Sequence, residues 1–444
     1  MPDQEKPMEA EEMQLVETNR KRSRMICVIV SLAISAVVIA LAVCGVWIQG
    51  RAENPLFCEG VVPVRTEGAE GKWGYVDRHG HFEIEAKYDS AKPFSANGLA
   101  AVCIDGCWGY IDREGTMVIE PSFSDAYPFD DYGLAEVELD GLLGCINRRG
   151  ELVIPAKYSF ISAFDASGIA RVKLDKYYGF VNTEGVVFIE PKYDNARDFA
   201  DNGLAAVKKD GKWGFINRRG ELCVVRRFDA VSDFGDNGLA MVRSNNLCGF
   251  VNQSGNYVIW PVYETAGQFG PNGLAAVRVE DRWGYINARG EMVIPPLYDD
   301  AGQFGANGLA AVAVGEQIGF IDASGAFVVQ PLFDEVVVFE DSGYVAVCVN
   351  EHWGIMDSKG VLLTKLVYPE VGVLSDGRIA FADQEGSEGY LDRAGQIRIA
   401  ARFQYAGTFY TDGYAVVQKD GLYGIIDREG AFVVSPKFSA IGQE

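Results

Sequence analysis

One glycine recurs every 35 residues along most of this chain, and that spacing limits the possible folds more than any other feature. The first is Gly74, and ten equal steps lead to Gly424. A period of this length is typical of stacked or ring-forming repeats, because one short unit cannot bury an apolar face alone. Positions are numbered below from this glycine, as position 0. The eleven origin glycines are Gly74, Gly109, Gly144, Gly179, Gly214, Gly249, Gly284, Gly319, Gly354, Gly389 and Gly424.

Other positions keep the same register. Position +6 is glycine, position +3 is Asp or Asn, and position +14 is Tyr or Phe in all eleven repeats. Position +20 is Phe in nine of the eleven repeats. We interpret the recurring Trp as core and the Asp or Asn as a turn residue that binds local backbone. The structural motif residues are Trp73, Gly74, Asp77, Gly80, Trp108, Gly109, Trp213, Gly214, Asn217, Gly220, Trp283, Gly284, Asn287, Trp353 and Gly354.

Each repeat predicts three β-strands. In the repeat around Gly214, strands are expected at 204–209, 213–217 and 222–225. Asp210-Gly211 is a strong two-residue hairpin signal, and the turn 217–220 begins with Asn and ends with Gly. Both faces of the middle strand are apolar, so each small sheet must be packed between its neighbours.

Two arrangements satisfy that requirement. The expected fold is an all-β open solenoid or superhelix of eleven 35-residue antiparallel meanders. A closed, propeller-like ring is the alternative. We favour the open array because propellers usually have about 4–8 blades. In addition, the chain ends after a complete third strand, 432–434, so no blade shared between the two ends is visible.

The motif resembles the WG-repeat family, also called KWG repeats, which occurs mainly in bacterial proteins. The match is fullest at 73–77, 213–217 and 283–287, where Trp-Gly-aromatic-aliphatic-Asp/Asn is complete. Six repeats lack the Trp, and the repeat with Glu388 at that position matches least well. The resemblance implies a binding or scaffold array and brings no catalytic residues with it.

The N-terminal region predicts a membrane anchor. Residues 25–48 are uncharged, and at 1.5 Å per residue a helix of that length is about 36 Å long, enough to span a bilayer. Basic residues 20–24 precede it, so residues 1–24 are expected in the cytoplasm. The expected organisation is a tail (1–24), a transmembrane signal anchor (25–48), a linker (49–57) and an extracytoplasmic repeat array (58–444) in a single-pass cell-membrane protein. Cleavage near residue 50 and lipidation at Cys44 are the alternatives.

Charge and composition exclude several functions. The formal net charge is −22, from 40 basic and 62 acidic residues, so a nucleic-acid partner is not expected. Only three histidines are present, and we identify no catalytic, cofactor-binding or metal-binding set. Acidic loops such as 198–203 lack the spacing of a Ca²⁺-binding loop. Cys103 and Cys107 flank a two-residue turn and should point to opposite faces, so no disulfide is predicted there.

The variable positions lie at the hairpin tips, which is typical of an interaction array. We predict a non-catalytic, membrane-anchored scaffold that binds a protein or a cell-envelope component. The alternative is an envelope carbohydrate-binding protein in which Ca²⁺ assists binding, and a hydrolase is the third candidate. The candidate partner-binding tip residues are Lys208, Lys209, Arg243, Arg278 and Arg282.

Overall fold

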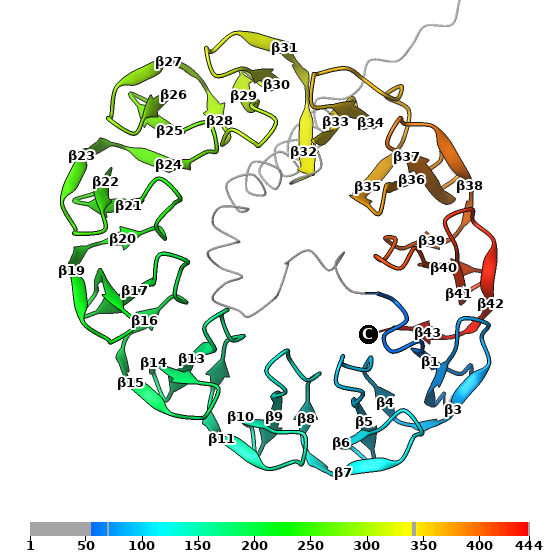
Figure 1. Ribbon diagram of the computed structural model, residues 1–444. Coiled ribbons are helices and arrows are strands. Elements are labelled where there is room, and N and C mark those ends of the chain that lie inside the picture. Colours follow the sequence, from blue (N-terminus) through cyan, green and yellow to red (C-terminus); the bar gives the residue numbers. More distant parts are fainter. Residues whose placement is uncertain (1–54, 69–70, 340–342, 443–444) are drawn as a thin grey trace, which may run out of the picture. The chain divides into compact units, whose positions relative to one another are not determined.

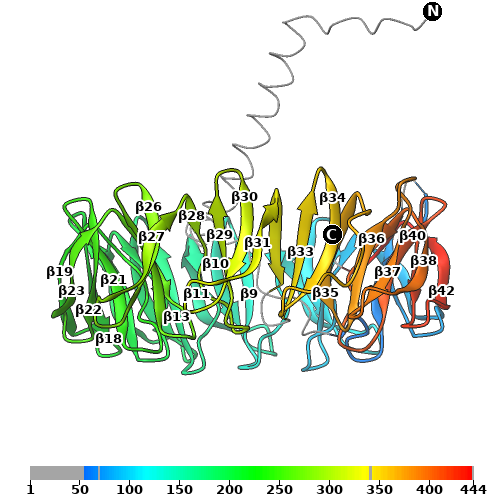
Figure 2. The same cartoon turned by 90° about the horizontal axis from the view of Figure 1, so that it is seen from above.

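The repeats form a closed ring of blades around a central channel (Figure 1). The computed structural model describes residues 55–68, 71–339 and 343–442, and within them the strands form eleven small antiparallel sheets. Seen from the side, the strands run between the two faces of the ring (Figure 2). The fold is therefore an eleven-bladed β-propeller. The expected open solenoid is wrong, and the ring that we considered as the alternative is present.

The blades are numbered along the chain, and their strands are given from the channel outward. Blade 1 has β43 (Ala440–Ile441), β1 (Val62–Arg65), β2 (Trp73–Val76) and β3 (Phe82–Tyr88); blade 2 has β4 (Ser90–Ala91), β5 (Ala100–Ile104), β6 (Cys107–Ile111) and β7 (Met117–Phe123); blade 3 has β8 (Asp125–Ala126), β9 (Ala135–Leu139), β10 (Leu142–Ile146) and β11 (Leu152–Tyr158); blade 4 has β12 (Phe160–Ile161), β13 (Ile169–Leu174), β14 (Tyr177–Asn182) and β15 (Val187–Tyr193). Blade 5 has β16 (Asn195–Ala196), β17 (Leu204–Lys209), β18 (Lys212–Asn217) and β19 (Leu222–Phe228); blade 6 has β20 (Ala230–Val231), β21 (Leu239–Ser244), β22 (Leu247–Asn252) and β23 (Tyr257–Tyr263); blade 7 has β24 (Thr265–Phe269), β25 (Leu274–Val279), β26 (Arg282–Asn287) and β27 (Met292–Tyr298); blade 8 has β28 (Asp300–Ala301), β29 (Ala310–Val314), β30 (Gln317–Ile321) and β31 (Phe327–Phe333). Blade 9 has β32 (Glu335–Phe339), β33 (Tyr344–Val349) and β34 (His352–Asp357); blade 10 has β35 (Glu370–Ser375), β36 (Arg378–Ala382), β37 (Glu388–Asp392) and β38 (Ile397–Phe403); blade 11 has β39 (Tyr405–Ala406), β40 (Ala415–Lys419), β41 (Leu422–Ile426) and β42 (Phe432–Phe438).

The three predicted strands of each repeat are supplemented by a fourth, short strand next to the channel. It follows the aromatic at +14 and pairs with the first strand of the next repeat, as Asn195 with Lys208 and Ala196 with Val207. Each blade thus combines the end of one repeat with the body of the next. In eight blades this strand has only two residues, too few for a period-2 pattern to be recognised. In blades 7, 9 and 10 it is longer, as β24, β32 and β35 show, and the sequence did not predict it there either.

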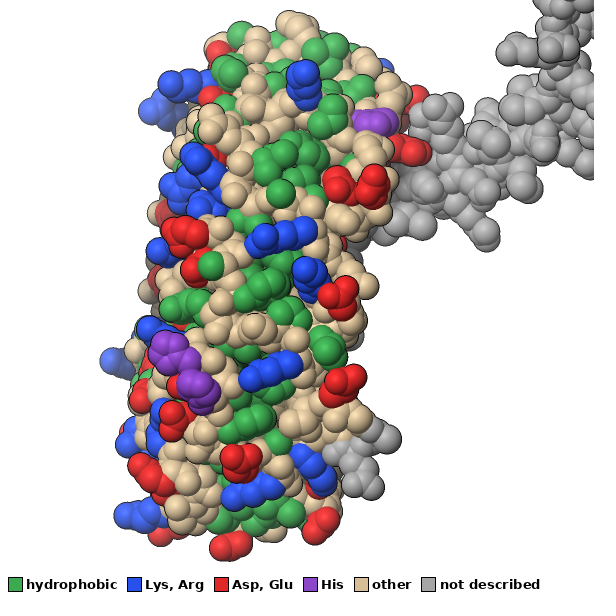
Figure 3. Space-filling model, turned by 90° about the vertical axis from the view of Figure 1, so that its right-hand side faces the viewer, with side chains coloured by type: hydrophobic (Ala, Val, Ile, Leu, Met, Phe, Trp, Pro, Cys, Tyr) green, Lys and Arg blue, Asp and Glu red, His purple; other side chains and the backbone are tan. Residues whose placement is uncertain are grey.

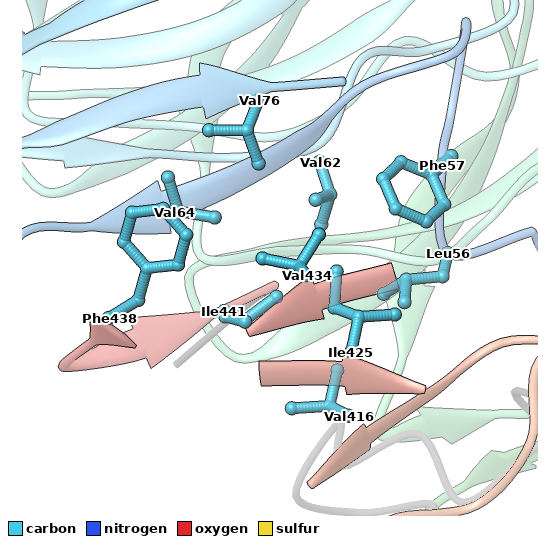
Figure 4. Close-up of a cluster of buried hydrophobic side chains, with 10 residues drawn as sticks. All are labelled: Leu56, Phe57, Val62, Val64, Val76, Val416, Ile425, Val434, Phe438 and Ile441. Carbon is cyan, nitrogen blue, oxygen red and sulfur yellow. The ribbon is translucent and has the colours of Figure 1, made fainter. Parts of the chain in front are cut away.

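The same offset closes the ring. The last repeat ends with β43, which pairs with β1 through Val64–Ile441 and Arg65–Ala440. Figure 4 shows side chains from both ends of the described chain meeting in one cluster at this seam. Leu56 and Phe57, placed in the expected linker, belong to this cluster. The blade shared by the two ends was missed because its C-terminal part is this two-residue strand.

The origin glycine is required by close contact with the outer strand. A Cβ added to Gly214 would lie 2.4 Å from the carbonyl oxygen of Val224, well inside van der Waals contact. The glycine at +6 has a different cause, since Gly220 has a φ of 75°, in the region that favours glycine. The aromatic at +1 packs on the phenylalanine at +20, as Phe215 does on Phe234 with ring centroids 4.7 Å apart.

Blade 9 departs from this pattern. Its sheet has three strands within the described residues, and no outer strand pairs along β34. Residues 361–369 take that place with single bridges, Met356–Leu362 and Trp353–Tyr368. We expected the weakest repeat at Glu388, but that blade has four strands, and the irregular one immediately precedes it.

The predicted membrane anchor has no counterpart among the described residues. No helix in the described ranges is long and apolar enough to cross a bilayer, which contradicts the single-pass cell-membrane localisation as far as those ranges extend. Residues 25–48, on which the predicted transmembrane anchor depends, lie outside the described residues, as do 1–24 and most of 49–57.

Candidate functional site: an apolar arc on the rim

The outer strands present a row of side chains at the rim of the ring. Burial alternates along β19. Val224 and Phe228 are buried, Arg226 is half-buried, and Val225 and Arg227 are exposed. Successive strand residues point to opposite faces, and positions +9, +11 and +13 therefore form the outer surface of each blade. The rim is the surface on which the repeats differ most systematically.

Position +13 is basic in six of the eleven repeats, and Arg227, Arg402 and Lys437 hydrogen-bond from this position to the next blade. Arg227 lies over the ring of Phe228, with 5.1 Å from Cζ to the ring centroid. Its Nη2 also donates a 2.8 Å hydrogen bond to the carbonyl of Gly255 in the next blade. Lys437 repeats this arrangement with Phe438 and Gly80. Figure 3 shows Lys and Arg side chains recurring along the rim at β38, β42 and β3.

Four consecutive repeats replace this cation with an aliphatic residue. Val262, Leu297, Leu332 and Val367 occupy position +13, and the first three are 61%, 63% and 55% exposed. Trp260 at +11 is 69% exposed and stacks on Tyr257 at 4.8 Å. We call this surface the apolar arc. It comprises Val258, Trp260, Val262, Val293, Leu297, Val328, Leu332, Val361, Leu362 and Val367.

The arc is similar in area to the largest apolar patch of a typical monomer. Ten side chains, each roughly half exposed, present on the order of 500 Å² of apolar surface. Exposed apolar patches of about 300–600 Å² are the largest that monomers usually carry, and they are often functional. The arc also gives up the cation–π contact and inter-blade hydrogen bond made by Arg227. Its side chains are therefore not explained by the packing of the ring.

At its end in blade 9 the arc is notched. Position +10 is Ile or Val in ten repeats but Thr364 here. The Thr364 hydroxyl accepts a 2.9 Å hydrogen bond from the Ile355 backbone N–H, so a side chain takes over from a strand partner. Leu363 N–H donates to the carbonyl of Ile355 at 2.8 Å. The segment 361–369 consequently satisfies the β34 edge without forming a strand.

Two hollows flank this segment. One, of about 440 Å³, is mainly apolar and lies towards β31, with Leu332, Phe333, Leu362 and Leu366 among its walls. The other, of about 520 Å³, includes polar groups from His352, Asn350 and Gln384. Leu366 and Val349 line both. We call segment 361–369 together with these two hollows the notch. It places an apolar hollow and a polar one side by side at the end of the arc.

The candidate tip residues lie on the hairpin side of the rim and contact carboxylates. Arg278 Nη2 is 2.6 Å from Asp281 Oδ1, and Arg282 Nη1 is 2.5 Å from Asp299 Oδ1. Lys208 lies 6.0 Å from the ring centroid of Trp213. Lys208 and Lys209 are half-buried, and Arg243 is exposed. Their role in partner binding stays a prediction, but several of these cations are occupied by the fold.

The motif residues are placed inside the blades. Trp73 is buried, and the other four motif tryptophans are half-buried against the +14 position, as Trp213 is opposite Phe228. Asn217 Oδ1 accepts hydrogen bonds from the N–H groups of Arg219 and Glu221 at 2.9 and 3.0 Å. These motif residues therefore stabilise the packing and the turns within each repeat.

Cys103, Cys107 and Glu136 illustrate how the blades place cysteine and acidic side chains. Cys103 is buried, Cys107 is exposed, and the pairing of Cys103 with Trp108 and Ile104 with Cys107 is the one predicted. Burial raises the pKa of Glu136 to about 7, and Asp125 adds to this rise. Across the described ranges no cluster of His, Cys, Asp and Glu could hold a metal ion.

Comparison with known families now decides the classification. The WG containing repeat matches ten stretches, at residues 73–106, 108–142, 144–178, 178–213, 213–248, 249–283, 283–316, 318–351, 389–423 and 423–443. The chain belongs to the WG-repeat family. The unmatched stretch 352–388 contains β34 and the segment that replaces its outer strand, so the family pattern fails where the blade does. No curated protein sequence matches this WG-repeat chain.

Solved structures similar to the WG propeller are distant. A eukaryotic initiation factor shares 13% identity, with 68% of this chain and 94% of that chain covered and a TM-score of 0.38. BamB from Moraxella catarrhalis shares 14%, covering 70% and 95%, with a TM-score of 0.32. Virginiamycin B lyase from Staphylococcus aureus shares 14%, covering 50% and 90%, with a TM-score of 0.28. Similarity this low carries no argument about function.

The arc itself was not predicted from the sequence. Its signal is present there, because position +13 changes from Lys or Arg to Val or Leu in four consecutive repeats. That change becomes meaningful only once the outer strand is known to face solvent at +13. The notch has a sequence signal too, in Thr364 at a position that is otherwise Ile or Val.

Proposed function

We propose that this WG propeller is a non-catalytic scaffold that binds a protein partner through the apolar arc. The observation that carries the proposal is the run of four aliphatic residues at +13, where six other repeats have Lys or Arg. Large exposed apolar patches on soluble surfaces mark interaction sites. The notch supports the same role, since a partner side chain can enter a recess lined by Phe333 and Leu366.

A carbohydrate ligand is the second candidate, and Trp260 is the observation that favours it. An exposed indole can stack on a sugar ring, and Trp260 is the most exposed large apolar side chain of the arc. Sugars also need polar groups beside the aromatic platform. The exposed arc residues on the same two blades, Val258, Val262, Val293 and Leu297, are aliphatic, which favours a protein surface over a saccharide.

The test compares two triple variants of the full chain. Val262→Ser/Leu297→Ser/Leu332→Ser removes apolar surface from the arc, and serine is tolerated at +13 because blade 2 has Ser122 there. Val118→Ser/Val186→Ser/Ile397→Ser is the matched control, since these residues are similarly exposed outside the arc. Each variant is cross-linked in cells of the source organism, and the partners are quantified by mass spectrometry against the unaltered chain.

Proteins captured by the unaltered chain and the control but lost from the arc variant support the proposal. Equal capture by all three chains, at equal melting temperature, contradicts it. Binding of oligosaccharides that is abolished by Trp260→Ala and unaffected by the arc triple variant assigns the surface to the second candidate instead.

A further inference from the structure

The arc has an edge of high net negative charge on one side only. Hairpin tips and inter-blade links of blades 6–9 run along one edge of it, and the turns at +3 to +7 run along the other. Leu297 is two residues from Asp299, which places the end of the outer strand next to the hairpin side. The two edges differ strongly in their balance of acids and bases.

The hairpin side is acidic. Between residues 243 and 352 its tips and links hold seven carboxylates against three guanidinium groups, those of Arg243, Arg278 and Arg282. We call the carboxylates the acidic row. It comprises Glu264, Glu280, Asp281, Asp299, Glu316, Asp334 and Glu351. Arg278 and Arg282 contact Glu264, Asp281 and Asp299, so even complete pairing leaves the row negatively charged.

The turn side of the arc is close to neutral. Its four turns, 252–256, 287–291, 322–326 and 357–361, contain Glu291, Asp322 and Asp357 as acids and Arg289 and Lys359 as bases. Asp322 Oδ1 accepts N–H hydrogen bonds within its own turn, at 2.9 and 3.1 Å, and Asp357 Oδ1 does the same at 2.9 and 2.8 Å. Glu264, Asp299 and Asp334 of the acidic row also accept backbone N–H groups, so the two edges differ in their net charge.

We infer that the partner docks with an amphipathic segment that is apolar towards the arc and basic along the edge next to the acidic row. This inference rests on the proposed function and specifies the chemistry of the partner. Complementary charge fixes orientation and speeds encounter more than it adds affinity. An apolar anchor in the notch and lysines or arginines over Glu280, Glu316 and Glu351 would fix the register of the segment along four blades.

The test uses synthetic peptides of about eight helical turns, about 43 Å long, because four blades spaced by about 10 Å or more must be spanned. One carries leucine on one face and lysine on the other, the second carries glutamate in place of lysine, and the third is a scrambled form of the first. Each is titrated into the full chain by fluorescence anisotropy at low and high salt. We expect the leucine–lysine peptide to bind, to bind more weakly as salt increases, and to bind more tightly than the other two.

Charge and apolar surface are then removed separately. Glu280→Gln/Glu316→Gln/Glu351→Gln should weaken binding of the leucine–lysine peptide about tenfold. The matched control, Glu114→Gln/Glu184→Gln/Glu429→Gln, neutralises three exposed carboxylates outside the arc and should leave binding unchanged. Val262→Ser/Leu297→Ser/Leu332→Ser should abolish binding without changing its dependence on the acidic row.

The outcomes separate the two proposals. If the glutamate peptide binds equally well, or if neutralising the acidic row has no effect, the inference about a basic partner is overturned while the arc remains a docking surface. If the arc variant binds every peptide normally, the proposed function fails. A concentration-dependent dimer in sedimentation that is lost in the arc variant would make a second copy of the chain the occupant and overturn the inference.

Discussion

Blades 2–5 and blades 6–9 share one backbone pattern but connect to their neighbours differently. In blades 2–5, charged side chains near the channel join successive blades, with Lys92–Asp125 at 3.0 Å, Arg171–Asp198 at 3.3 Å and Arg197–Asp233 at 3.4 Å. In blades 7 and 8, position +18 is Gly267 or Gly302 instead of Lys92 or Arg197. At the rim, position +13 is a cation in blades 3–5 and aliphatic in blades 6–9.

The difference shows which contacts the ring requires. The apolar core between blades is equivalent in both groups, as the clusters around Phe215 and Tyr285 illustrate. Blades 7 and 8 also carry charged contacts, Arg278–Asp281 and Arg282–Asp299, but these lie at the hairpin tips and links. The repeat therefore fixes the fold through its core and its glycines, and leaves the rim and the channel wall free to acquire binding chemistry.

The largest expected effect contrasts a regular blade with the irregular one. Gly214→Ala should lower the free energy of unfolding by about 3 kcal/mol, because the new Cβ would meet the Val224 carbonyl oxygen at 2.4 Å. Gly354→Ala should cost about 1 kcal/mol, since its nearest neighbours at 2.9 Å are the Leu366 and Thr364 side chains, which can shift. Urea unfolding of both variants measures the difference, and equal costs would mean that segment 361–369 is as rigid as the outer strand of a regular blade.

The second prediction is that the free energy of unfolding depends on pH through Glu136 in blade 3. Glu136 occupies the place of Ala206 and Ala276 in the other repeats, where it faces Cys145, Asp125 and Lys92. Burial raises the pKa of Glu136 to about 7, above its unfolded value, so the folded state holds this proton more tightly. Its contribution to stability is complete below about pH 4.5 and is lost as the pH rises through about 7.

Glu136→Gln keeps the site neutral at every pH. Between about pH 5 and pH 8 the unaltered chain should lose about 2 kcal/mol more stability than this variant does. Denaturant unfolding at several pH values gives the difference directly. Parallel stability profiles for the two chains would show that Glu136 remains hydrated and ionised between the blades.

The smallest expected effect exchanges the rim residues of the two groups. Leu297→Arg should stabilise blade 7 by about 0.5 kcal/mol, because the guanidinium can lie over Tyr298 as Arg227 lies over Phe228. Arg227→Leu should destabilise blade 5 by a similar amount. Thermal unfolding measures both. A loss of stability in Leu297→Arg would indicate that the arc packs against the ring, in conflict with its interpretation as a binding surface.

Much of the fold was predictable because it repeats. The strands expected at 204–209, 213–217 and 222–225, the Asn217 turn and the opposite faces of Cys103 and Cys107 all follow from short-range patterns that recur in register. The third strand extends beyond its predicted end and includes Phe228. Ring closure was not predictable in the same way. It depends on two-residue strands and on the angle between blades, and neither leaves a periodic pattern in the sequence.

The candidate site was less predictable for a related reason. An aliphatic residue at +13 is an ordinary strand residue unless the exposed side of the strand is known. Leu297 and Ile294 are both apolar and lie three residues apart on β27, yet one is exposed and the other is buried. Alternation places residues three apart on opposite faces of a strand, so it separates the two side chains, but it does not say which of the two apolar faces is exposed.

The offset between repeat and blade bears on how such a chain can change in length. Because every repeat ends with the strand that completes its successor, the final repeat always supplies the strand that the first one lacks, as β43 does for β1. Duplication or deletion of one whole 35-residue unit therefore leaves matching ends. The number of blades can drift during evolution without any special terminal sequence, limited only by the wedge angle that the packed blades tolerate.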